Sequence, residues 1–341
     1  MNTVEWLGLS LASHCNLSCK YCFISASREG RLLDYGRAEN FLSFFSDYAI
    51  PRTKIHFTGG EPTLHPKILD MVDVAEENYV DPHVWVATNG VFPHSKLKGF
   101  LKRDVLLHVT FEGLPDIHDL ERPFPDLKGS SDFVLKTIRD VVAEDPDKLV
   151  LRMNYSKNKV GREAEIADFL ASLGVKNVSL GVLYPLGKGC TYAHVDTLGC
   201  FRRVPLFERL LEARGLDLRL SKTAPTKSPR WPSCGGGTVS FFLTVDGKIV
   251  TCQSIPVASE AAKEHEMFIV GEVDGEVKVD GERLERFLEF AGHVPEKCAG
   301  CFAKDYCGGC PLQRKVSKGK VTFEETYCKS ERALIKARGW V

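Results

Sequence analysis

KIHFTGGEPTLHPKILDMVDVAEENYVDPHVWVATNG, residues 54–90, contains the repeating unit that decides the fold. Its first seven residues form an apolar strand pattern that ends in two glycines, and residues 65–79 have the apolar spacing of a helix. Residues 83–90 then return to a strand pattern. Strands that alternate with helices are typical of α/β folds with a parallel sheet. The stretch therefore predicts a β-strand/α-helix/β-strand unit.

The same alternation extends in both directions and gives about six strand–helix pairs in order. Strands are predicted at 5–12, 54–60, 83–90, 104–113, 148–156 and 177–185, and helices at 34–49, 65–79, 95–103, 131–144 and 162–174. Ser131 or Asp132 is expected to cap the fourth of these helices, and Gly174 to end the fifth. An eight-fold barrel typically needs about 250 residues, and these pairs end near residue 185. The sequence therefore predicts an α/β fold with a partial (β/α)6 TIM-type barrel.

The pattern changes after residue 190. A helix is predicted at 202–215, residues 222–237 are rich in Pro, Ser, Thr and Gly as in a linker, and residues 238–252 form a hairpin pattern with an Asp246–Gly247 turn. Five cysteines follow after residue 297. We expect a barrel over 1–190, a bridging helix and linker over 191–230, and a Cys-rich domain over 231–341.

The net charge limits which partners are expected, and the cysteine content indicates the cellular compartment. The 341 residues contain 45 Lys and Arg and 45 Asp and Glu, so the net charge of +0 argues against nucleic acid or an anionic membrane as the main partner. The first residues lack the features of a secretory signal, and no apolar run approaches the ~20 residues of a membrane span. We expect a cytoplasmic protein whose 12 cysteines hold metal in reduced form.

Four glycine-rich or polar stretches follow the first four predicted strands, where the carboxyl ends of parallel strands form one mouth. The first stretch contains Cys15, Cys19 and Cys22, with gaps of three and two residues. Three thiolates on one loop suit a 4Fe–4S cluster with one iron left open. A structural zinc site, for which His14 is one residue out of step, and plain buried thiols are the alternatives.

This cysteine spacing, with aromatic Tyr21 before the last cysteine, resembles the signature of radical S-adenosylmethionine (SAM) enzymes. The Gly-Gly-Glu-Pro stretch after the second strand resembles the family's other common motif. The resemblance implies that the open iron chelates SAM, and that one electron cleaves SAM to methionine and a 5′-deoxyadenosyl radical. The implied SAM-binding residues are Tyr21, Gly59, Gly60, Glu61, Pro62, Asn89 and Thr110.

Individual roles follow from the resemblance and from position. The glycines would let the backbone approach the methionine moiety, Glu61 would support its ammonium group or the loop, and Tyr21 would lie near the adenine. Asn89 is a candidate for a ribose or methionine contact, or a turn residue before Gly90. Thr110 is a candidate for the same contacts, or an ordinary strand residue.

The C-terminal cysteines resemble the SPASM extension of radical SAM enzymes, which holds two auxiliary 4Fe–4S clusters. By that resemblance an outer cluster is bound by Cys298, Cys301, Cys307 and Cys328, and an inner cluster by Cys234, Cys252 and Cys310. Two departures leave the inner cluster's nuclearity open: the gap between Cys307 and Cys310 is two residues, and Ser240 stands where some relatives have a further cysteine. A zinc ribbon over 298–310 is the alternative, and Cys190 and Cys200 are spare thiols that we expect to be buried or incidental.

The segment that begins at Phe111 also resembles the family's strand-4 region, with Glu112 where an Asp is usual. Its His118, Asp119 and Arg122 belong either to this motif or to a solvated, salt-bridged loop.

The resemblance implies oxidative modification of a peptide or protein, such as a crosslink, with the auxiliary clusters aiding electron transfer and flavodoxin or ferredoxin as electron donor. Modification of a small cofactor precursor such as a tetrapyrrole is the alternative. Sulfatase maturation is disfavoured, because Gln253 stands where those members have an Asp base. A non-enzymatic electron carrier is disfavoured because it needs no SAM-binding motif. We expect an oxygen-sensitive, anaerobic enzyme.

Overall fold

The computed structural model describes residues 3–183, 188, 197–218, 234–255, 265–317, 320–323 and 325–339. Its strands are β1 (Val4–Ala12), β2 (Ala49–Gly59), β3 (His83–Thr88), β4 (Val105–Thr110), β5 (Leu149–Tyr155), β6 (Asn177–Val182), β7 (Ser240–Leu243), β8 (Lys248–Val250), β9 (Ile269–Asp274), β10 (Glu276–Val279), β11 (Arg314–Ser317) and β12 (Lys320–Phe323). Cys190 and most of the predicted linker lie outside these ranges.

Helices follow the strands in the predicted order. They are α1 (Tyr35–Ser46), α2 (Ile68–Asn78), α3 (His94–Leu101), α4 (Pro115–Glu121), α5 (Ser131–Glu144), α6 (Glu163–Ser172), α8 (Thr197–Glu212), α10 (Gly281–Gly292), α11 (Glu296–Ala299), α12 (Lys304–Cys307) and α13 (Glu325–Ala337). Short 3-10 turns lie at η1 (Pro62–Leu64), η2 (Pro146–Lys148), η3 (Lys157–Lys159), η4 (Glu266–Phe268) and η5 (Pro311–Gln313).

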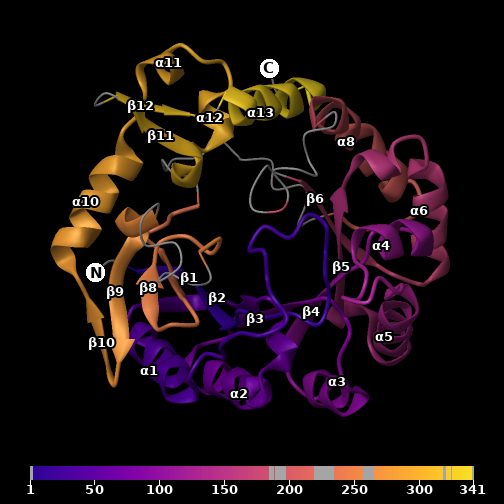
Figure 1. Ribbon diagram of the computed structural model, residues 1–341, viewed down its shortest axis with the longest axis horizontal. Coiled ribbons are helices and arrows are strands. Elements are labelled where there is room, and N and C mark those ends of the chain that lie inside the picture. The colour runs from indigo at the N-terminus through magenta and orange to yellow at the C-terminus, as the bar shows by residue number, and fades with distance from the viewer. Residues whose placement is uncertain are drawn as a thin grey trace.

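One ten-stranded sheet in the described residues runs in the order β10-β9-β8-β7-β1-β2-β3-β4-β5-β6. Strands β1 to β6 are parallel neighbours, so the predicted α/β fold with a partial six-stranded barrel is confirmed. Helices α1 to α6 cover the outside of the curved sheet, and the cysteine loop after β1 lies on its inner side (Figure 1).

The alternation of burial along the strands explains this layering. On β4, Val105, Leu107 and Val109 are at most 1% exposed and belong to the core shared with the helices, whereas His108 and Thr110 are only half-buried. Side chains of a strand point to opposite faces in turn, so the second set faces the interior of the barrel. The inner face is therefore the more polar one.

The sheet crosses the boundary that was predicted between the barrel and the Cys-rich region. Strand β7 pairs in parallel with β1, with Leu7 opposite Phe241, and the predicted hairpin of β7 and β8 turns at Gly247 with φ of +81°. At the far end α13 packs on α8, which completes a ring (Figure 1). The predicted division of the chain at residues 190 and 230 stays a prediction. Residues of the first and the third predicted segment, however, belong to one sheet.

Two local predictions about helix ends had different outcomes. Gly174 adopts φ of +74° just after Leu173, the C-cap residue of α6, and ends this helix as predicted. The predicted cap of α5 was wrong: Ser130 is the N-cap residue but makes no capping hydrogen bond with its side chain. The carboxylate of Asp119 instead accepts the Ser131 N–H at 2.8 Å. A side chain from α4 therefore satisfies this helix end.

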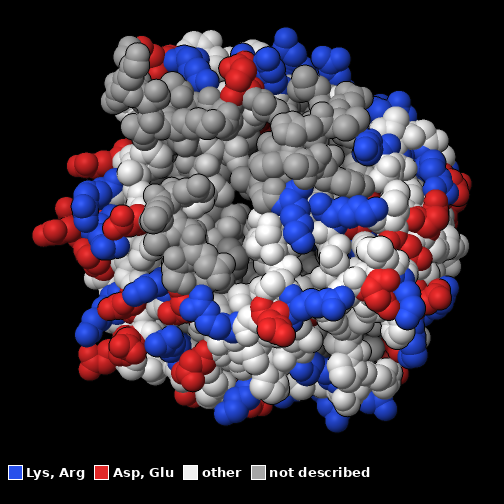
Figure 2. Space-filling model, in the orientation of Figure 1, with Lys and Arg blue, Asp and Glu red and all other residues white. Residues whose placement is uncertain are grey.

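Acidic and basic side chains alternate around the rim of the face in Figure 2, in keeping with the balanced net charge. Within the described ranges, no helix is long and apolar enough to cross a membrane.

Candidate active site

The N-terminal cysteines lie together on the loop that follows β1. Burial raises the pKa of the Cys15 thiol to about 12 and also raises that of Cys19. Cys19 raises the pKa of Cys15, and Cys22 raises that of Cys19, so the three thiols lie close together. Thiols that are hard to ionise alone are deprotonated when they bind metal, so this crowded and dry position suits a metal cluster. Among the described residues, no three Cys, His, Asp or Glu side chains converge closely enough to hold a single ion.

Backbone hydrogen bonds hold this loop at both sides. The Cys15 N–H donates to the carbonyl of Ser27 at 3.0 Å, which closes the loop on itself. The Ser18 and Lys20 N–H groups donate to the carbonyls of Pro123 and Glu121 at 2.8 and 2.9 Å. The end of α4 therefore runs along the cysteine segment and fixes its path.

The two glycines of residues 59–60 are required by this loop. A Cβ atom on Gly60 would lie 2.1 Å from the carbonyl oxygen of His14, and one on Gly59 would lie 2.5 Å from that of Ala12. Gly59 also has φ of +134°, a conformation that glycine favours. In the described residues, the backbone of these two glycines thus packs closely against the start of the cysteine loop. The predicted approach to a methionine moiety stays a prediction.

Glu61 is fully buried and supports the loops around it. Its carboxylate accepts hydrogen bonds from the hydroxyls of Thr63 and Thr88 at 2.6 and 2.7 Å, and from the Asn89 N–H at 2.7 Å. Pro62 follows it and opens the 3-10 turn η1. Glu61 was predicted to support either the ammonium group of SAM or the loop. Its hydrogen bonds within the protein are those expected for support of the loop.

Asn89 faces the cysteine loop and also forms a turn. Its side-chain amide donates to Asn16 Oδ1 at 2.7 Å and approaches Cys15 Sγ to 3.6 Å, while its Oδ1 accepts the Val91 N–H at 2.8 Å. Thr110 is the last residue of β4, half-buried, and paired in register with Arg152. Both residues lie at the carboxyl ends of inner strands, where they were expected.

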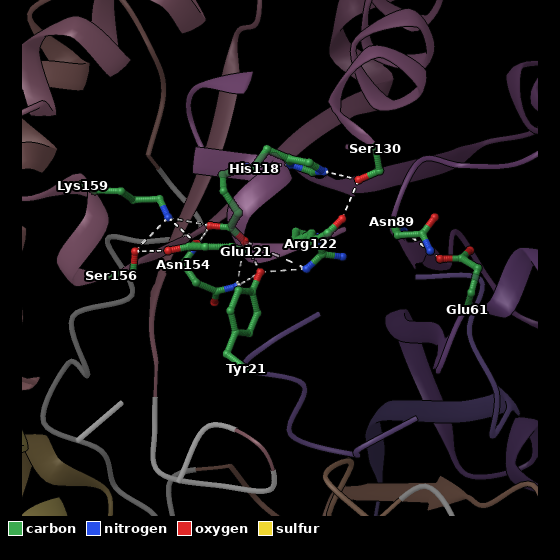
Figure 3. Close-up of polar contacts among 11 residues, drawn as sticks. Tyr21, Glu61, Asn89, His118, Glu121, Arg122, Ser130, Asn154, Ser156 and Lys159 are labelled. Carbon is green, nitrogen blue, oxygen red and sulfur yellow. Dashed lines mark hydrogen bonds and ion pairs between the residues drawn. The ribbon is translucent and has the colours of Figure 1, made fainter. Parts of the chain in front are cut away.

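Tyr21 connects the cysteine loop to a buried ionic network. Its hydroxyl donates to Glu112 Oε1 and accepts from Arg122 Nη1 at 2.8 Å, with the Asn154 amide at 3.4 Å (Figure 3). Glu112 is fully buried and Arg122 is 9% exposed. The hydroxyl of this motif residue is therefore engaged by the protein itself, and its predicted position near adenine stays a prediction.

Lys159 completes the network from the end of β5. Its ammonium lies 2.9 Å from a carboxylate oxygen of Glu112 and 2.9 Å from one of Glu121, and all three side chains are fully buried. With Arg122 the cluster has two carboxylates and two cations. Burial opposes ionisation of Glu112, but Lys159 and Arg122 outweigh it and lower its pKa. The charges therefore balance inside the protein, as buried ions require.

His118 is fully buried on α4 and ties the same segment together. Its Nδ1 accepts the Glu112 N–H at 3.2 Å. Its Nε2 lies 3.0 Å from Ser130 Oγ, which itself donates to the Arg122 carbonyl at 2.6 Å. Burial lowers the pKa of His118 to about 3, so the ring is neutral. The segment is a buried helix, so the interpretation as a solvated loop was wrong, and its place in the family's strand-4 motif stays a prediction.

Three C-terminal cysteines lie near one another at the end of the sheet. Burial raises the pKa of Cys252 to about 12, and the nearby Cys310 and Cys234 raise it further. These are the three cysteines that the resemblance assigned to an inner cluster. Ser240 is buried and donates its hydroxyl to the Cys234 carbonyl at 3.0 Å, so it packs at the edge of this group.

A second C-terminal group surrounds α12 and α13. Cys328 raises the pKa of Cys307, which burial brings to about 11, and Cys301 raises the pKa of Cys328. The Cys301 N–H donates to the carbonyl of Cys298 at 3.2 Å, which brings all four predicted outer ligands together. Cys200, by contrast, is 4% exposed in the hydrophobic core and is a packing residue, as expected.

Fold and site together define an α/β partial-barrel protein with a thiol-rich loop at the carboxyl ends of its parallel strands. Residues 9–170 match the family model described as the radical SAM superfamily. These matched residues form a radical SAM domain, as the sequence predicted.

Curated relatives are distant. An uncharacterised protein of Methanocaldococcus jannaschii is 28% identical over 189 residues, 54% of this chain and 65% of that protein. A GTP 3′,8-cyclase of Chlorobaculum tepidum is 32% identical over 33% of this chain and 32% of its own length. The chain thus spans less than two thirds of either relative. The AdoMet-dependent heme synthase of Methanosarcina barkeri is 21% identical over 96% of this chain and 97% of its own length.

Solved structures share the fold over almost the whole chain. The structure of anSMEcpe with bound AdoMet has a TM-score of 0.78 at 17% identity and covers 97% of this chain and 96% of its own. Streptococcus suis SuiB bound to precursor peptide SuiA has a TM-score of 0.69 at 16% identity and covers 96% of this chain and 76% of its own. The likeness includes the Cys-rich C-terminal region.

Proposed function

We propose that this protein reductively cleaves SAM and uses the resulting 5′-deoxyadenosyl radical to modify a peptide or protein oxidatively. A 4Fe–4S cluster held by Cys15, Cys19 and Cys22 supplies the electron and the open iron for SAM. The observation that carries the proposal is the radical SAM domain with these three thiols gathered on one anchored loop, with Cys19 buried. Reduction by flavodoxin or ferredoxin and an anaerobic, cytoplasmic setting are parts of the same proposal.

The residues around the thiols fit a SAM cradle at the mouth of the barrel. We assign the SAM-facing surface to Tyr21, Gly59, Gly60, Glu61, Pro62, Asn89 and Thr110. Asn89 supports this best, because its amide lies 3.6 Å from Cys15 Sγ and so borders the cluster position. The buried network behind Tyr21 keeps the cysteine loop in place without needing water to solvate its charges.

Auxiliary clusters belong to the proposal as electron acceptors. Two groups of thiols support it: Cys234, Cys252 and Cys310, and Cys298, Cys301, Cys307 and Cys328. Hydrogen abstraction followed by bond formation leaves one electron on the substrate, and a nearby oxidised cluster can accept it. One or two clusters are compatible with the two groups.

A peptide or protein substrate is supported by the fold, which is shared with SuiB bound to a precursor peptide. Sulfatase maturation is the less favoured form of this chemistry, because Gln253 follows Cys252 and cannot act as a carboxylate base.

A second candidate is modification of a small cofactor precursor such as a tetrapyrrole. It is favoured by the match to the AdoMet-dependent heme synthase, which spans nearly all of both chains.

The test uses anaerobically purified protein with its clusters, reduced with dithionite in the presence of SAM. Formation of 5′-deoxyadenosine and methionine is the expected result, and zinc in place of iron, or no cleavage, would contradict the proposal. Deuterium transfer to 5′-deoxyadenosine from a labelled peptide or from a labelled tetrapyrrole then decides between the two substrate classes.

A further inference from the structure

Among the described residues, Arg152 is a cationic side chain on the inner face of the barrel that has no counter-ion of its own. Arg152 lies in the middle of β5, two residues before Asn154, whose amide points to the Tyr21 hydroxyl. Residues two apart on a strand share a face, so Arg152 faces the same interior space as the cysteine loop. In the described part of the chain its guanidinium forms no ion pair or hydrogen bond, and Glu112, the acid whose charge acts on it, is bound to Lys159.

The surroundings of Arg152 are enclosed although water reaches its side chain. Arg152 is exposed, yet the surrounding protein desolvates it and lowers its pKa. An exposed group on the outer surface would not be desolvated in this way, so the side chain lies in an inward-facing position. An unpaired guanidinium in such a place is costly unless a ligand anion neutralises it.

Two neutral histidines lie on the same inner face: His108 on β4, the strand next to β5, and His56 on β2, two strands beyond β4. His56 of β2 is 5% exposed, and neither of its ring nitrogens has a hydrogen-bond partner among the described residues. Burial lowers the pKa of His56 to about 3, and the charges of His108 and Arg152 lower it further. These three side chains therefore lie near one another. Gln253 lies beside the His56 ring without forming a hydrogen bond of normal geometry. Buried imidazoles without partners are aimed at a ligand or at water.

An aromatic wall supports these histidines. Trp85 of β3 stacks on His56 with ring centroids 4.9 Å apart and on His108 at 5.7 Å. Trp6 of β1 lies 6.3 Å from Trp85, and its indole N–H is buried without a partner in the described residues. The inner face thus offers a flat apolar surface next to hydrogen-bond donors and one cation.

We propose that Arg152 and His108 bind a carboxylate of the substrate on the inner face of the barrel, and that His56, on the other side of Trp85, forms a hydrogen bond to the same substrate molecule. The planar guanidinium suits bidentate binding of a carboxylate, and the neutral imidazoles add hydrogen bonds without further charge. This inference rests on the proposed function, because both substrate classes considered there carry carboxylates: acidic side chains in a peptide, or propionate-type side chains in a tetrapyrrole. Trp85 packs against the body of the same substrate.

The test measures binding to the anaerobic, cluster-loaded full chain by calorimetry with two matched pairs of probes. One pair is a short glutamate-containing peptide amide and its glutamine counterpart, and the other is coproporphyrin III and its tetraamide. We expect the acid of one pair to bind at least about ten-fold more tightly than its neutral partner. The pair that responds identifies the source of the carboxylate.

Variants connect this preference to the residue. Arg152→Gln is expected to remove the preference, Arg152→Lys to keep part of it, and Arg139→Gln, an exposed position on the outer helix α5, to leave it unchanged. Equal binding of acid and neutral probes by the wild type, or no binding of either acid, would overturn the proposal. So would a preference that survives in Arg152→Gln, or a loss of affinity in that variant for SAM alone.

Cleavage of SAM is measured on the same samples without any probe. A wild-type protein that prefers the acid but fails to cleave SAM refutes the proposed function and leaves the carboxylate site standing. A protein that cleaves SAM but shows no preference refutes the site alone.

Discussion

The two cysteine-rich regions of this protein are held in place by different means. The N-terminal loop is anchored by hydrogen bonds to residues 121–123 and by a buried ionic network that reaches its Tyr21 hydroxyl. The last five cysteines, from Cys298 to Cys328, lie on or beside the four-residue helices α11 and α12 and on α13. Short helices are marginal in isolation, so that region depends more on what its thiols bind. The comparison indicates that the N-terminal site is formed before metal binds, whereas the C-terminal region is completed by the metal that it binds.

The largest effect is expected from Cys19→Ala. Without this buried thiolate the N-terminal cluster cannot assemble, so reductive SAM cleavage is lost completely while the C-terminal clusters remain. Anaerobic protein is assayed for 5′-deoxyadenosine, and its iron content and electron paramagnetic resonance spectrum show which clusters persist. Cys200→Ala, in the core, is the matched control, and SAM cleavage that persists in Cys19→Ala would refute the assignment.

Next comes Lys159→Met, which removes the cation between two buried carboxylates. Breaking a buried ion pair from one side costs about 3–5 kcal/mol, because Glu112 and Glu121 keep uncompensated charge. We expect the free energy of unfolding, measured with urea under anaerobic conditions, to fall by that amount. Lys157→Met, at a neighbouring exposed position, should change little. An unchanged stability of Lys159→Met would show that the network does not anchor the loop.

Cys307→Ala probes the other region. Loss of a residue that supports a metal ligand commonly costs about ten- to a hundred-fold in affinity or activity, and loss of the ligand itself should cost at least as much, so we expect product formation to fall at least about ten-fold while SAM binding is kept. The same variant should make residues 296–339 more susceptible to proteolysis than the barrel, because the bound cluster organises the short helices. Product formation at the wild-type rate would argue against an auxiliary role, and unchanged proteolysis would argue against the comparison itself.

The smallest effect is expected from Tyr21→Phe, which keeps the ring and removes the hydroxyl between Glu112 and Arg122. Loss of one partner in a buried hydrogen-bonded network costs about 1–3 kcal/mol. Urea unfolding should show this loss, with the spectrum of the N-terminal cluster altered and those of the C-terminal clusters unchanged. Identical spectra and stability would mean that Tyr21 does not couple the loop to the network.

Much of the barrel could be predicted from periodicity, because each strand and helix of residues 54–90 has a complete pattern of its own. The pairing of β7 with β1 could not, since it joins segments more than two hundred positions apart and no local pattern encodes it. Helix α4 was missed because seven residues are too few for a periodic signal.

The site was predictable where spacing carries the chemistry, as at Cys15, Cys19 and Cys22. The ionic network was not, because Lys, Glu and Arg are rarely buried and composition favours placing them in solvent. A usable signal was their position: Glu112 and Lys159 each lie just beyond the end of an inner strand, at the same edge of the sheet as the cysteine loop. Whether such a charge is paired inside depends on partners that only the tertiary structure brings together.

The place of β1 in the middle of the sheet also has a consequence for biosynthesis. Its hydrogen-bonding edge towards β7 stays open on the ribosome until residues 240–243 have emerged. An uncovered strand edge of apolar residues invites pairing with other nascent chains. We therefore expect truncated forms that end before β7 to accumulate as aggregates.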